Sequence, residues 1–298
     1  MIKVLQQYEF LKTIYADVIT GRSWCEKYSC FVKHLTELDY AELIRSKRQY
    51  IQELKRQGVP SEAERLLSLK EQGLWTDKDE DDLLTLRLVI SDNAKLVERI
   101  MVPSQRAPIE SIISQKRLEL STMSEKRAEL IQSTVEQHGT RHYAALFPKI
   151  SMFKDAALSI PRFSTEEYDE MDDSDLVEIH SQYSLAVQDY SEYNFRALAC
   201  MPFVLNQISS CKKNLYNYLG KPVVNFTIYQ QDVLNKTLRN LSVIENSESD
   251  PIDIEEETIL QDVIDWYDLN FSILLSKRQS SSQDTGVKTS KNYVSNKK

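Results

Sequence analysis

The amino-acid sequence predicts a mainly α fold, in which a long antiparallel, coiled-coil-like helical hairpin is joined to a second helical domain with little or no sheet. In several long segments, apolar residues recur every three or four positions, the spacing that places them on one face of a helix. The chain has 298 residues but only 6 glycines and 8 prolines, so residues that interrupt helices are scarce. Start signals precede three consecutive segments of this kind.

Two shorter helices are expected before the hairpin. Residues 1–35 are the least regular stretch, in which residues 4–18 fit either helix or strand and residues 19–23 fit a turn. Thr36 then opens a helix that Gly58 is expected to end in the left-handed conformation that glycine adopts most easily. Ser61 to Glu64 form a capping box, in which side chains bond the free backbone N–H groups at a helix start, and this helix is expected to end at Gly73.

The predicted hairpin spans residues 76–135. Thr76 is expected to cap the first arm, and the acidic residues that follow it stand where the helix dipole favours negative charge. The six residues Pro103–Pro108 are expected to connect the arms, each roughly 40 Å long at the usual helical rise. Each arm carries an apolar stripe that would face the other arm: Leu83, Leu86, Ile90, Ala94, Val97 and Met101 in the first, and Ile109, Ile113, Leu120, Met123, Leu130 and Thr134 in the second.

Two cations, Lys116 and Arg127, interrupt the second stripe. In an antiparallel register in which facing residue numbers sum to about 210, Arg127 lies beside Asp79 and Asp82, and Lys116 lies beside Asp92. Alternatively, both side chains extend along their stems into solvent. The outer apolar residues of the hairpin are expected to dock on a third helix or on another protein: Leu84, Leu88, Val89 and Ile112.

An acidic segment, residues 161–175, is expected to be a solvated linker because it combines many like charges with no apolar pattern. It would separate an N-terminal domain, residues 1–160, from a C-terminal helical domain, residues 176–278. The tail, residues 279–298, is rich in Ser, Lys and Asn and is expected to be disordered.

The second domain is expected to begin with a long helix that runs from residue 174 to residue 200, with a further segment over residues 202–219 beyond Pro202. Residues 223–230 fit a short strand, but Thr227 equally fits the cap of a helix over residues 228–241. A last helix is expected over residues 255–275.

Composition restricts the functional classes. The six glycines stand alone, which excludes the phosphate-binding motifs that need clustered glycines. The net charge of −8 argues against a nucleic-acid-binding surface over the whole molecule, and no apolar run is long enough to span a membrane. The N-terminus lacks a signal-peptide core, so we expect a cytosolic protein whose four cysteines are free thiols.

We expect no catalytic, cofactor-binding or metal-binding residues, although one pair of histidines provides an alternative. His138 and His142 are four residues apart and share a face of a helix, the first requirement of a helical metal pair. His180 is the only other histidine nearby in sequence, so a third ligand would have to come from Glu136 or a distant acid. The alternative function is a metal-dependent hydrolase or a nucleic-acid-processing subunit that uses these histidines, and the simpler interpretation is that they are surface or half-buried side chains.

Two aromatic patterns have both a functional and a structural interpretation. A basic, tyrosine-containing helix fits a nucleic-acid-binding adaptor or simply the polar face of an amphipathic helix: Tyr40, Arg45, Lys47, Arg48, Tyr50, Lys55 and Arg56. Tyrosine side chains bury much area at low entropic cost, so Tyr183, Tyr190 and Tyr193 fit either an interface or ordinary core packing.

Several short motifs occur in an order that resembles a family of poorly characterised proteins of large tailed bacteriophages. The motifs lie between residues 55 and 270: Gly73-Leu-Trp75-Thr76, Thr134-Val-Glu136, Tyr143-Ala144, Phe195-Arg-Ala-Leu198, Leu219-Gly220-Lys-Pro222, Thr227 and Gln231. The chain departs from the family pattern at Phe203, where tryptophan is expected, and in its basic tail.

The resemblance implies a virion structural protein or a tail or baseplate assembly factor without catalytic residues. Its partners would be other structural or assembly proteins, or further copies of the chain, and neither a membrane nor nucleic acid is expected among them. It would act in the host cytoplasm during assembly and could then remain in the virion. The sequence therefore predicts a non-enzymatic helical interaction protein.

Overall fold

The computed structural model describes residues 3–100, 103–212, 214–255 and 258–286. Helices make up most of these residues, which confirms the mainly α fold, and three short strands form one antiparallel sheet.

The chain forms two compact units that do not follow the boundary expected at the acidic segment. One unit consists of Met1–Glu42 together with Ala145–Lys298, and the other consists of Leu43–Ala144. The N-terminal residues thus belong with the C-terminal helices, and the hairpin lies in a unit inserted between them in sequence.

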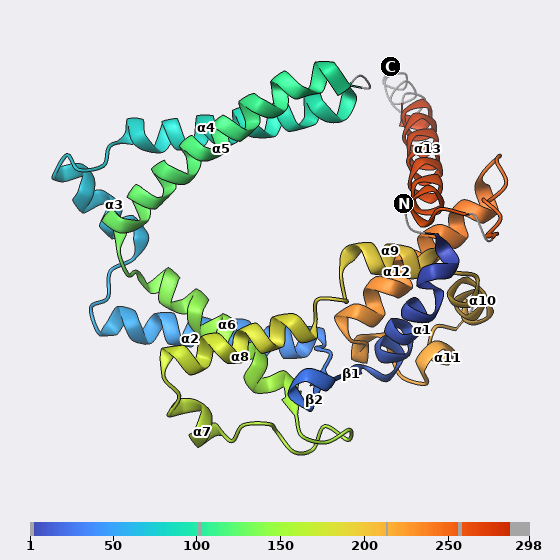
Figure 1. Ribbon diagram of the computed structural model, residues 1–298, viewed down its shortest axis with the longest axis horizontal. Coiled ribbons are helices and arrows are strands. Elements are labelled where there is room, and N and C mark those ends of the chain that lie inside the picture. The colour runs from blue at the N-terminus through green and yellow to red at the C-terminus, as the bar shows by residue number, and fades with distance from the viewer. Residues whose placement is uncertain (1–2, 101–102, 213, 256–257, 287–298) are drawn as a thin grey trace, which may run out of the picture. The chain divides into compact units, whose positions relative to one another are not determined.

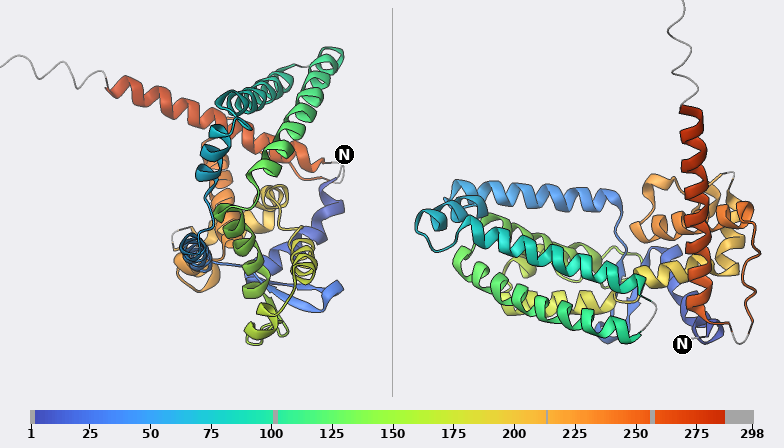
Figure 2. Two further views of the ribbon diagram at one scale, coloured as in Figure 1. Left: turned by 90° about the vertical axis from the view of Figure 1, so that its left-hand side faces the viewer. Right: turned by 90° about the horizontal axis from the view of Figure 1, so that it is seen from above.

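In the unit Leu43–Ala144, the hairpin is formed by α4 (Asp77–Arg99) and α5 (Pro103–Ile131), which run antiparallel side by side (Figures 1 and 2). The shorter helix α3 (Glu62–Glu71) packs against α5. Two longer helices, α2 (Glu37–Arg56) and α6 (Val135–Ser151), contribute residues to both units.

Four helix signals, two starts and two stops, are confirmed. Thr76 and Ser61 each accept a hydrogen bond from the backbone N–H three residues later, and each is part of a capping box that begins α4 or α3. Gly58 and Gly73 both have the left-handed backbone expected after a helix, with φ values of 84° and 66°. These starts and stops depend only on neighbouring residues, which is why the sequence predicts them well.

The connection between the two arms differs from the prediction. Pro103 begins α5 and Pro108 lies inside it, so the six residues expected to form a loop are the first turns of the second arm. Proline is well suited to the first helical position, because the N–H group that it lacks has no acceptor there. Pro108 gives up one backbone hydrogen bond, which the rest of this 29-residue helix tolerates. Met101 lies outside the described residues.

The other unit has a core of helices from both ends of the chain. The helices of this core are α1 (Val4–Thr20), α9 (Glu192–Cys200), α10 (Pro202–Cys211), α11 (Tyr216–Leu219), α12 (Ile228–Asn246) and α13 (Leu260–Gly286). A short 3-10 helix, Val223–Asn225, precedes α12. Apolar residues of these α-helices form one continuous buried cluster.

Four predictions for the C-terminal half need correction or are resolved. The helix expected over residues 174–200 is two helices, α8 (Asp173–Ala186) and α9, because Ser191 caps a new start. Thr227 caps α12, so the helical interpretation of this segment is right. The acidic segment contains the short helix α7 (Thr165–Asp169), and α13 extends to Gly286, so residues 279–286 are helical. Residues 287–298 lie outside the described part.

The small sheet follows α1. Its strands are β1 (Arg22–Cys25), β2 (Cys30–Lys33) and β3 (Met152–Phe153), arranged in that order, and a 3-10 turn at Glu26–Tyr28 connects the first two. Gln230 ties the start of α12 to the end of α1, because its side-chain amide donates to the carbonyl oxygens of Val18 at 2.8 Å and Ile19 at 3.1 Å.

His34 lies just beyond β2 and is only 2% exposed, yet neither ring nitrogen has a hydrogen-bond partner. Its ring packs edge-on against Tyr190 at 4.7 Å and Tyr229 at 4.9 Å between centroids. Burial in this aromatic surrounding disfavours the charged imidazolium and lowers the pKa of His34 to about 3.

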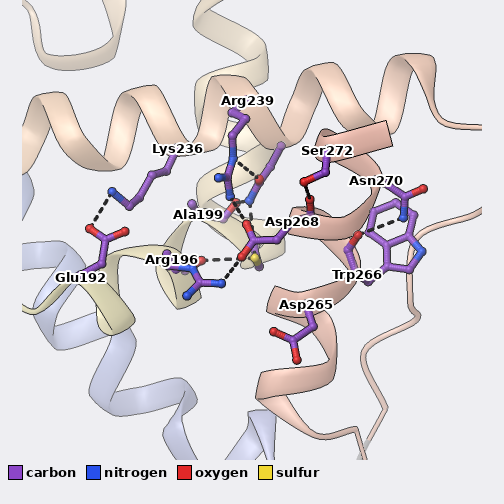
Figure 3. A network of polar contacts seen from close by, with 12 residues as sticks. Glu192, Arg196, Ala199, Lys236, Arg239, Asp265, Trp266, Asp268, Asn270 and Ser272 are labelled. Carbon is purple, nitrogen blue, oxygen red and sulfur yellow. Dashed lines mark hydrogen bonds and ion pairs between the residues drawn. The ribbon is translucent and has the colours of Figure 1, made fainter. Parts of the chain in front are cut away.

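Asp268 of α13 connects three helices of this core. It accepts hydrogen bonds from Arg196 of α9 and, at 2.7 Å, from Arg239 of α12 (Figure 3). Close by, the fully buried Asn240 donates to the Ala199 carbonyl oxygen at 3.0 Å. The carboxylate therefore balances the charge of two half-buried guanidinium groups and fixes the register of α13 on its neighbours.

We predict that acid destabilises this unit through His34. The unfolded chain takes up a proton near pH 6.5 and the folded protein does so only near pH 3, so stability is complete above pH 6.5 and falls as the pH decreases between these values. The slope from this residue approaches about 1.4 kcal/mol per pH unit. In urea unfolding at pH 4 to 7, His34→Phe should flatten the dependence, whereas replacement of the exposed His180 by Gln should leave it unchanged. An unchanged slope in His34→Phe would contradict the prediction.

We also predict that Asp268→Asn destabilises the protein by about 1–3 kcal/mol, because it leaves two half-buried arginines without a counter-charge. Asp265→Asn is the matched control. Asp265 lies one turn earlier in the same helix and is exposed, and no interaction is drawn between it and either arginine (Figure 3). Its replacement should change the free energy of unfolding by less than about 0.5 kcal/mol. Equal effects of the two changes in urea unfolding would refute the role given to Asp268.

Candidate interaction surface

The base of the hairpin is a small apolar core around a tryptophan. Trp75 precedes α4 and is almost fully buried. Its cluster takes one buried residue from each neighbouring helix: Leu69, Leu83 and Ile131. Residues of the predicted inner stripe of the second arm pack against it, including Leu120, Met123 and Leu130. The base of the hairpin is thus held by contacts with a third element, α3.

Arg127 of α5 lies at the edge of this core and binds two carboxylates. Its Nε donates to Glu80 of α4 at 2.6 Å, and its Nη2 donates to Glu62 of α3 at 2.7 Å. The indole Nε1 of Trp75 donates to the same Glu80 oxygen at 2.7 Å. Burial raises the pKa of Glu80, but the hydrogen bonds from Arg127 and Trp75 outweigh it and hold that pKa below its usual value.

The predicted partners of Arg127 are therefore corrected. The antiparallel register placed Arg127 beside Asp79 and Asp82, but its partner on α4 is Glu80. Asp79 instead accepts hydrogen bonds from the backbone N–H and the hydroxyl of Thr76, as the cap of α4 requires. The Asp79 carboxylate is thus used by the cap of α4, and Arg127 pairs with the next carboxylate along the helix, that of Glu80.

Lys116 behaves differently from Arg127. The register placed it beside Asp92, but its ammonium donates to Glu119 at 2.7 Å within the same helix, and Asp92 pairs with Lys95. Pairs of this kind, three residues apart on one helix face, contribute little to stability. Lys116 thus pairs along its own arm and does not connect the two arms.

The outer surface of the hairpin exposes large apolar side chains. Leu84 and Leu88 are each 55% exposed and lie four residues apart, so they share a face of α4. Ile112 is also exposed, whereas Val89 is half-buried. Leu118 of α5 is 70% exposed, although no apolar pattern in the sequence indicates it. It lies outside the stripe of its helix, and a lone apolar residue gives no periodic signal.

The three candidate tyrosines do not form one surface. Tyr183 is half-buried and contacts Phe147, with ring centroids 6.2 Å apart. Tyr190 is half-buried, stacks on Tyr229 and donates to Asp17 at 2.9 Å. Tyr193 is exposed. The first two therefore have packing partners inside their unit, and Tyr193 presents its ring to solvent.

One histidine of the pair, His142, has local side-chain partners. His142 lies 3.2 Å from the Ser46 hydroxyl and stacks on Tyr50, with ring centroids 4.2 Å apart. Glu136, a possible third ligand, accepts the backbone N–H of Glu62. Among the residues that the structure describes, no three His, Cys, Asp or Glu side chains come together in a metal-binding group. Gly139, between the histidines, allows α6 to approach α2, since a Cβ there would lie 2.5 Å from Ile51.

The basic face of α2 is exposed but mixed in charge. Arg45, Arg48 and Lys55 project into solvent, whereas Lys47 donates to Thr140 at 3.2 Å. An open hollow on this helix is lined by acidic and amide side chains as well as basic ones: Ser46, Gln49, Tyr50, Gln52, Glu53, Arg56 and His142. Arg56 pairs with Glu53. The basic residues of the tail, including Lys288 and Lys291, lie outside the described part of the chain.

We predict that Arg127→Met weakens the base of the hairpin by about 1–2 kcal/mol, because it leaves Glu62 and Glu80 half-buried without their cation. Lys116→Met, the same change on the same helix, should cost less than about 0.5 kcal/mol. Urea unfolding followed by helix content would measure both. If the two variants lost equal stability, Arg127 would have no special role at the base.

No helix among the described residues is long and apolar enough to cross a membrane. Comparisons with protein-family models, with curated proteins and with solved structures found no match. We therefore infer a function from the geometry of the described residues and from the resemblance given with the sequence.

Proposed function

We propose that this chain is a non-enzymatic interaction protein that holds another structural protein on the outer face of its helical hairpin. The setting that we propose is the assembly of a bacteriophage tail or baseplate, in line with the family that the sequence resembles. The observation that supports a binding role most directly is the exposure of Leu84 and Leu88 on one face of α4.

The exposed leucines could supply useful binding energy. Full burial of an exposed leucine side chain stabilises a complex by about 1.5–3 kcal/mol. Because Leu84 and Leu88 are each 55% exposed, covering both would contribute about 2–3 kcal/mol before the costs of association. Their helix is anchored at its base by Trp75 and by the bonds between Arg127 and Glu80. An anchored helix loses less conformational freedom on binding than a flexible segment does.

The charge beside the leucines indicates what kind of partner would fit. An open hollow of about 390 Å³ next to Leu84 is lined by three acids, Glu62, Glu80 and Asp81, together with Arg87 and Arg127. Glu62 and Glu80 are paired with Arg127, so the exposed Asp81 and the nearby Asp82 carry the negative charge that a partner would meet. A helix that offers apolar residues flanked by Lys or Arg would match this surface, as in other complexes in which an amphipathic helix binds a helical groove. A helix of another virion structural protein is therefore the occupant that we propose.

We predict that Leu84→Asp with Leu88→Asp weakens partner binding at least about tenfold without changing helix content. Leu67→Asp is the matched control, since Leu67 of α3 is equally exposed in the same unit. The partner can be identified with a photo-crosslinking residue at position 88 in infected cells, followed by mass spectrometry.

Crosslinks to a tail or baseplate protein that disappear with Leu84→Asp would support the proposal. Crosslinks to a second copy of the chain alone would replace the proposed partner by self-association. Crosslinks only to replication proteins or nucleic acid would favour the processing or adaptor functions, and metal analysis of the purified protein would then test the histidine alternative.

A further inference from the structure

Two of the four cysteines face each other across the β1–β2 hairpin. In the strand register, Cys25 pairs directly with Cys30, at the end of the ladder next to the 3-10 turn Glu26–Tyr28. Directly opposed residues of antiparallel strands have Cα atoms about 4.5–5.5 Å apart, and disulfides span about 4.4–6.8 Å. The side chains of an opposed pair also point to the same face of the sheet. The backbone therefore already holds the two residues at disulfide distance.

The surroundings of the pair differ for the two sulfur atoms. Cys30 is only 1% exposed, whereas Cys25 is half-buried, and both pack against one apolar cluster of this unit. Arg162 donates a hydrogen bond from Nη1 to the Cys30 sulfur at 3.3 Å. Burial raises the pKa of the Cys30 thiol, and the guanidinium of Arg162 opposes that rise. A cation thus lies next to the buried sulfur, where it can stabilise a thiolate.

The other two cysteines lack this arrangement. Cys200 is buried in α9, where it donates to the Arg196 carbonyl oxygen and accepts from Asn240. Cys211 lies at the end of α10, beside Ser210. The strand-paired cysteines are therefore distinct in geometry, and the helical ones serve as internal controls.

We propose that Cys25 and Cys30 form a redox-active dithiol, which low-molecular-weight disulfides such as oxidised glutathione convert to an intramolecular disulfide. This inference is independent of the partner proposed for the hairpin of α4 and α5.

The reaction is two thiol–disulfide exchanges. The more accessible Cys25 loses its proton, and its thiolate attacks one sulfur of oxidised glutathione, which forms a mixed disulfide and releases one glutathione thiolate. The Cys30 thiol then loses its proton beside Arg162, and its sulfur attacks the Cys25 sulfur and releases the second glutathione thiolate. In total, the protein dithiol is oxidised by two electrons, one glutathione disulfide is reduced to two glutathione molecules, and the two protons pass to the released thiolates.

The disulfide would act locally. It closes a loop of only a few residues, and so short a loop gains little stability from reduced chain entropy. It would lock the end of the β1–β2 ladder and change the acceptor of Arg162, a residue that follows β3 and whose backbone N–H donates to the Met152 carbonyl oxygen at 2.9 Å. The redox state of the two cysteines would thus change the conformation and contacts of the small sheet.

The full-length protein allows a direct test. It would be equilibrated with mixtures of reduced and oxidised glutathione, trapped with an alkylating reagent, and digested with trypsin without reduction. Cleavage after Arg22, Lys27 and Lys33 separates the cysteines into the peptides 23–27 and 28–33. We expect these two peptides to be joined, with a mass two hydrogens below their sum, while Cys200 and Cys211 stay alkylated.

Preorganisation by the sheet is tested by repeating the titration in concentrated urea. We expect the folded protein to close its disulfide with an effective concentration at least about tenfold higher than that of the unfolded chain. The double variant Cys200→Ser with Cys211→Ser should behave like the natural sequence, and Cys30→Ser should stop at a glutathione adduct on Cys25. Peptides 23–27 and 28–33 that remain separate at every glutathione ratio, or equal closure in the folded and unfolded chains, would overturn the proposal.

Discussion

The bonds of Arg127 to Glu80 and Glu62 are the contacts on which the hairpin unit depends. One guanidinium joins α5 to α4 and to α3, and the same Glu80 oxygen accepts the indole N–H of Trp75. Because these groups are only half exposed, water screens them less than it screens the surface pairs farther along the arms. The apolar cluster beneath them fixes the third helix against the hairpin. The outer leucines are therefore displayed from an anchored base.

In the other unit, different polar side chains join the helices. Its helices come from both ends of the chain, so their contacts must be specified by side chains far apart in sequence. Asp268 joins α9, α12 and α13 through two arginines, and Gln230 joins α12 to the end of α1. His34 is the exception, since it is buried among aromatic rings without a hydrogen-bond partner for either nitrogen. Because the imidazole is neutral at ordinary pH, its burial does not carry the large free-energy cost of burying a charge.

The two proposed activities would use different parts of the molecule. The hairpin presents apolar and acidic side chains, which suit recognition of a basic amphipathic helix. The β1–β2 ladder holds two thiols at a fixed distance, which suits exchange with small disulfides. Neither depends on a deep cavity, and each is built from side chains whose position is set by regular secondary structure.

Local signals in the sequence were sufficient for much of the helical pattern. The caps at Ser61, Thr76 and Thr227 and the left-handed Gly58 involve only residues within a few positions, so their physics is contained in short segments. The apolar spacing of α4 and α5 likewise predicted their facing stripes, except that Thr134, expected at the end of the second stripe, lies between α5 and α6. The loop expected at Pro103–Pro108 was wrong because proline is only weakly disruptive near the start of a helix.

The sequence by itself thus determined the mainly α class, several helix starts and the hairpin. Tertiary structure decided which charges pair, that residues before Leu43 join the C-terminal helices, and that Cys25 opposes Cys30. The physical reason is range: a cap or an apolar stripe is read from neighbouring residues, whereas an ion pair such as Arg196 with Asp268 exists only after distant helices have packed. The exposure of a side chain also depends on distant elements. Leu84 and Tyr190 are both apolar enough to bury, but the packing of other elements leaves Leu84 exposed and covers part of Tyr190.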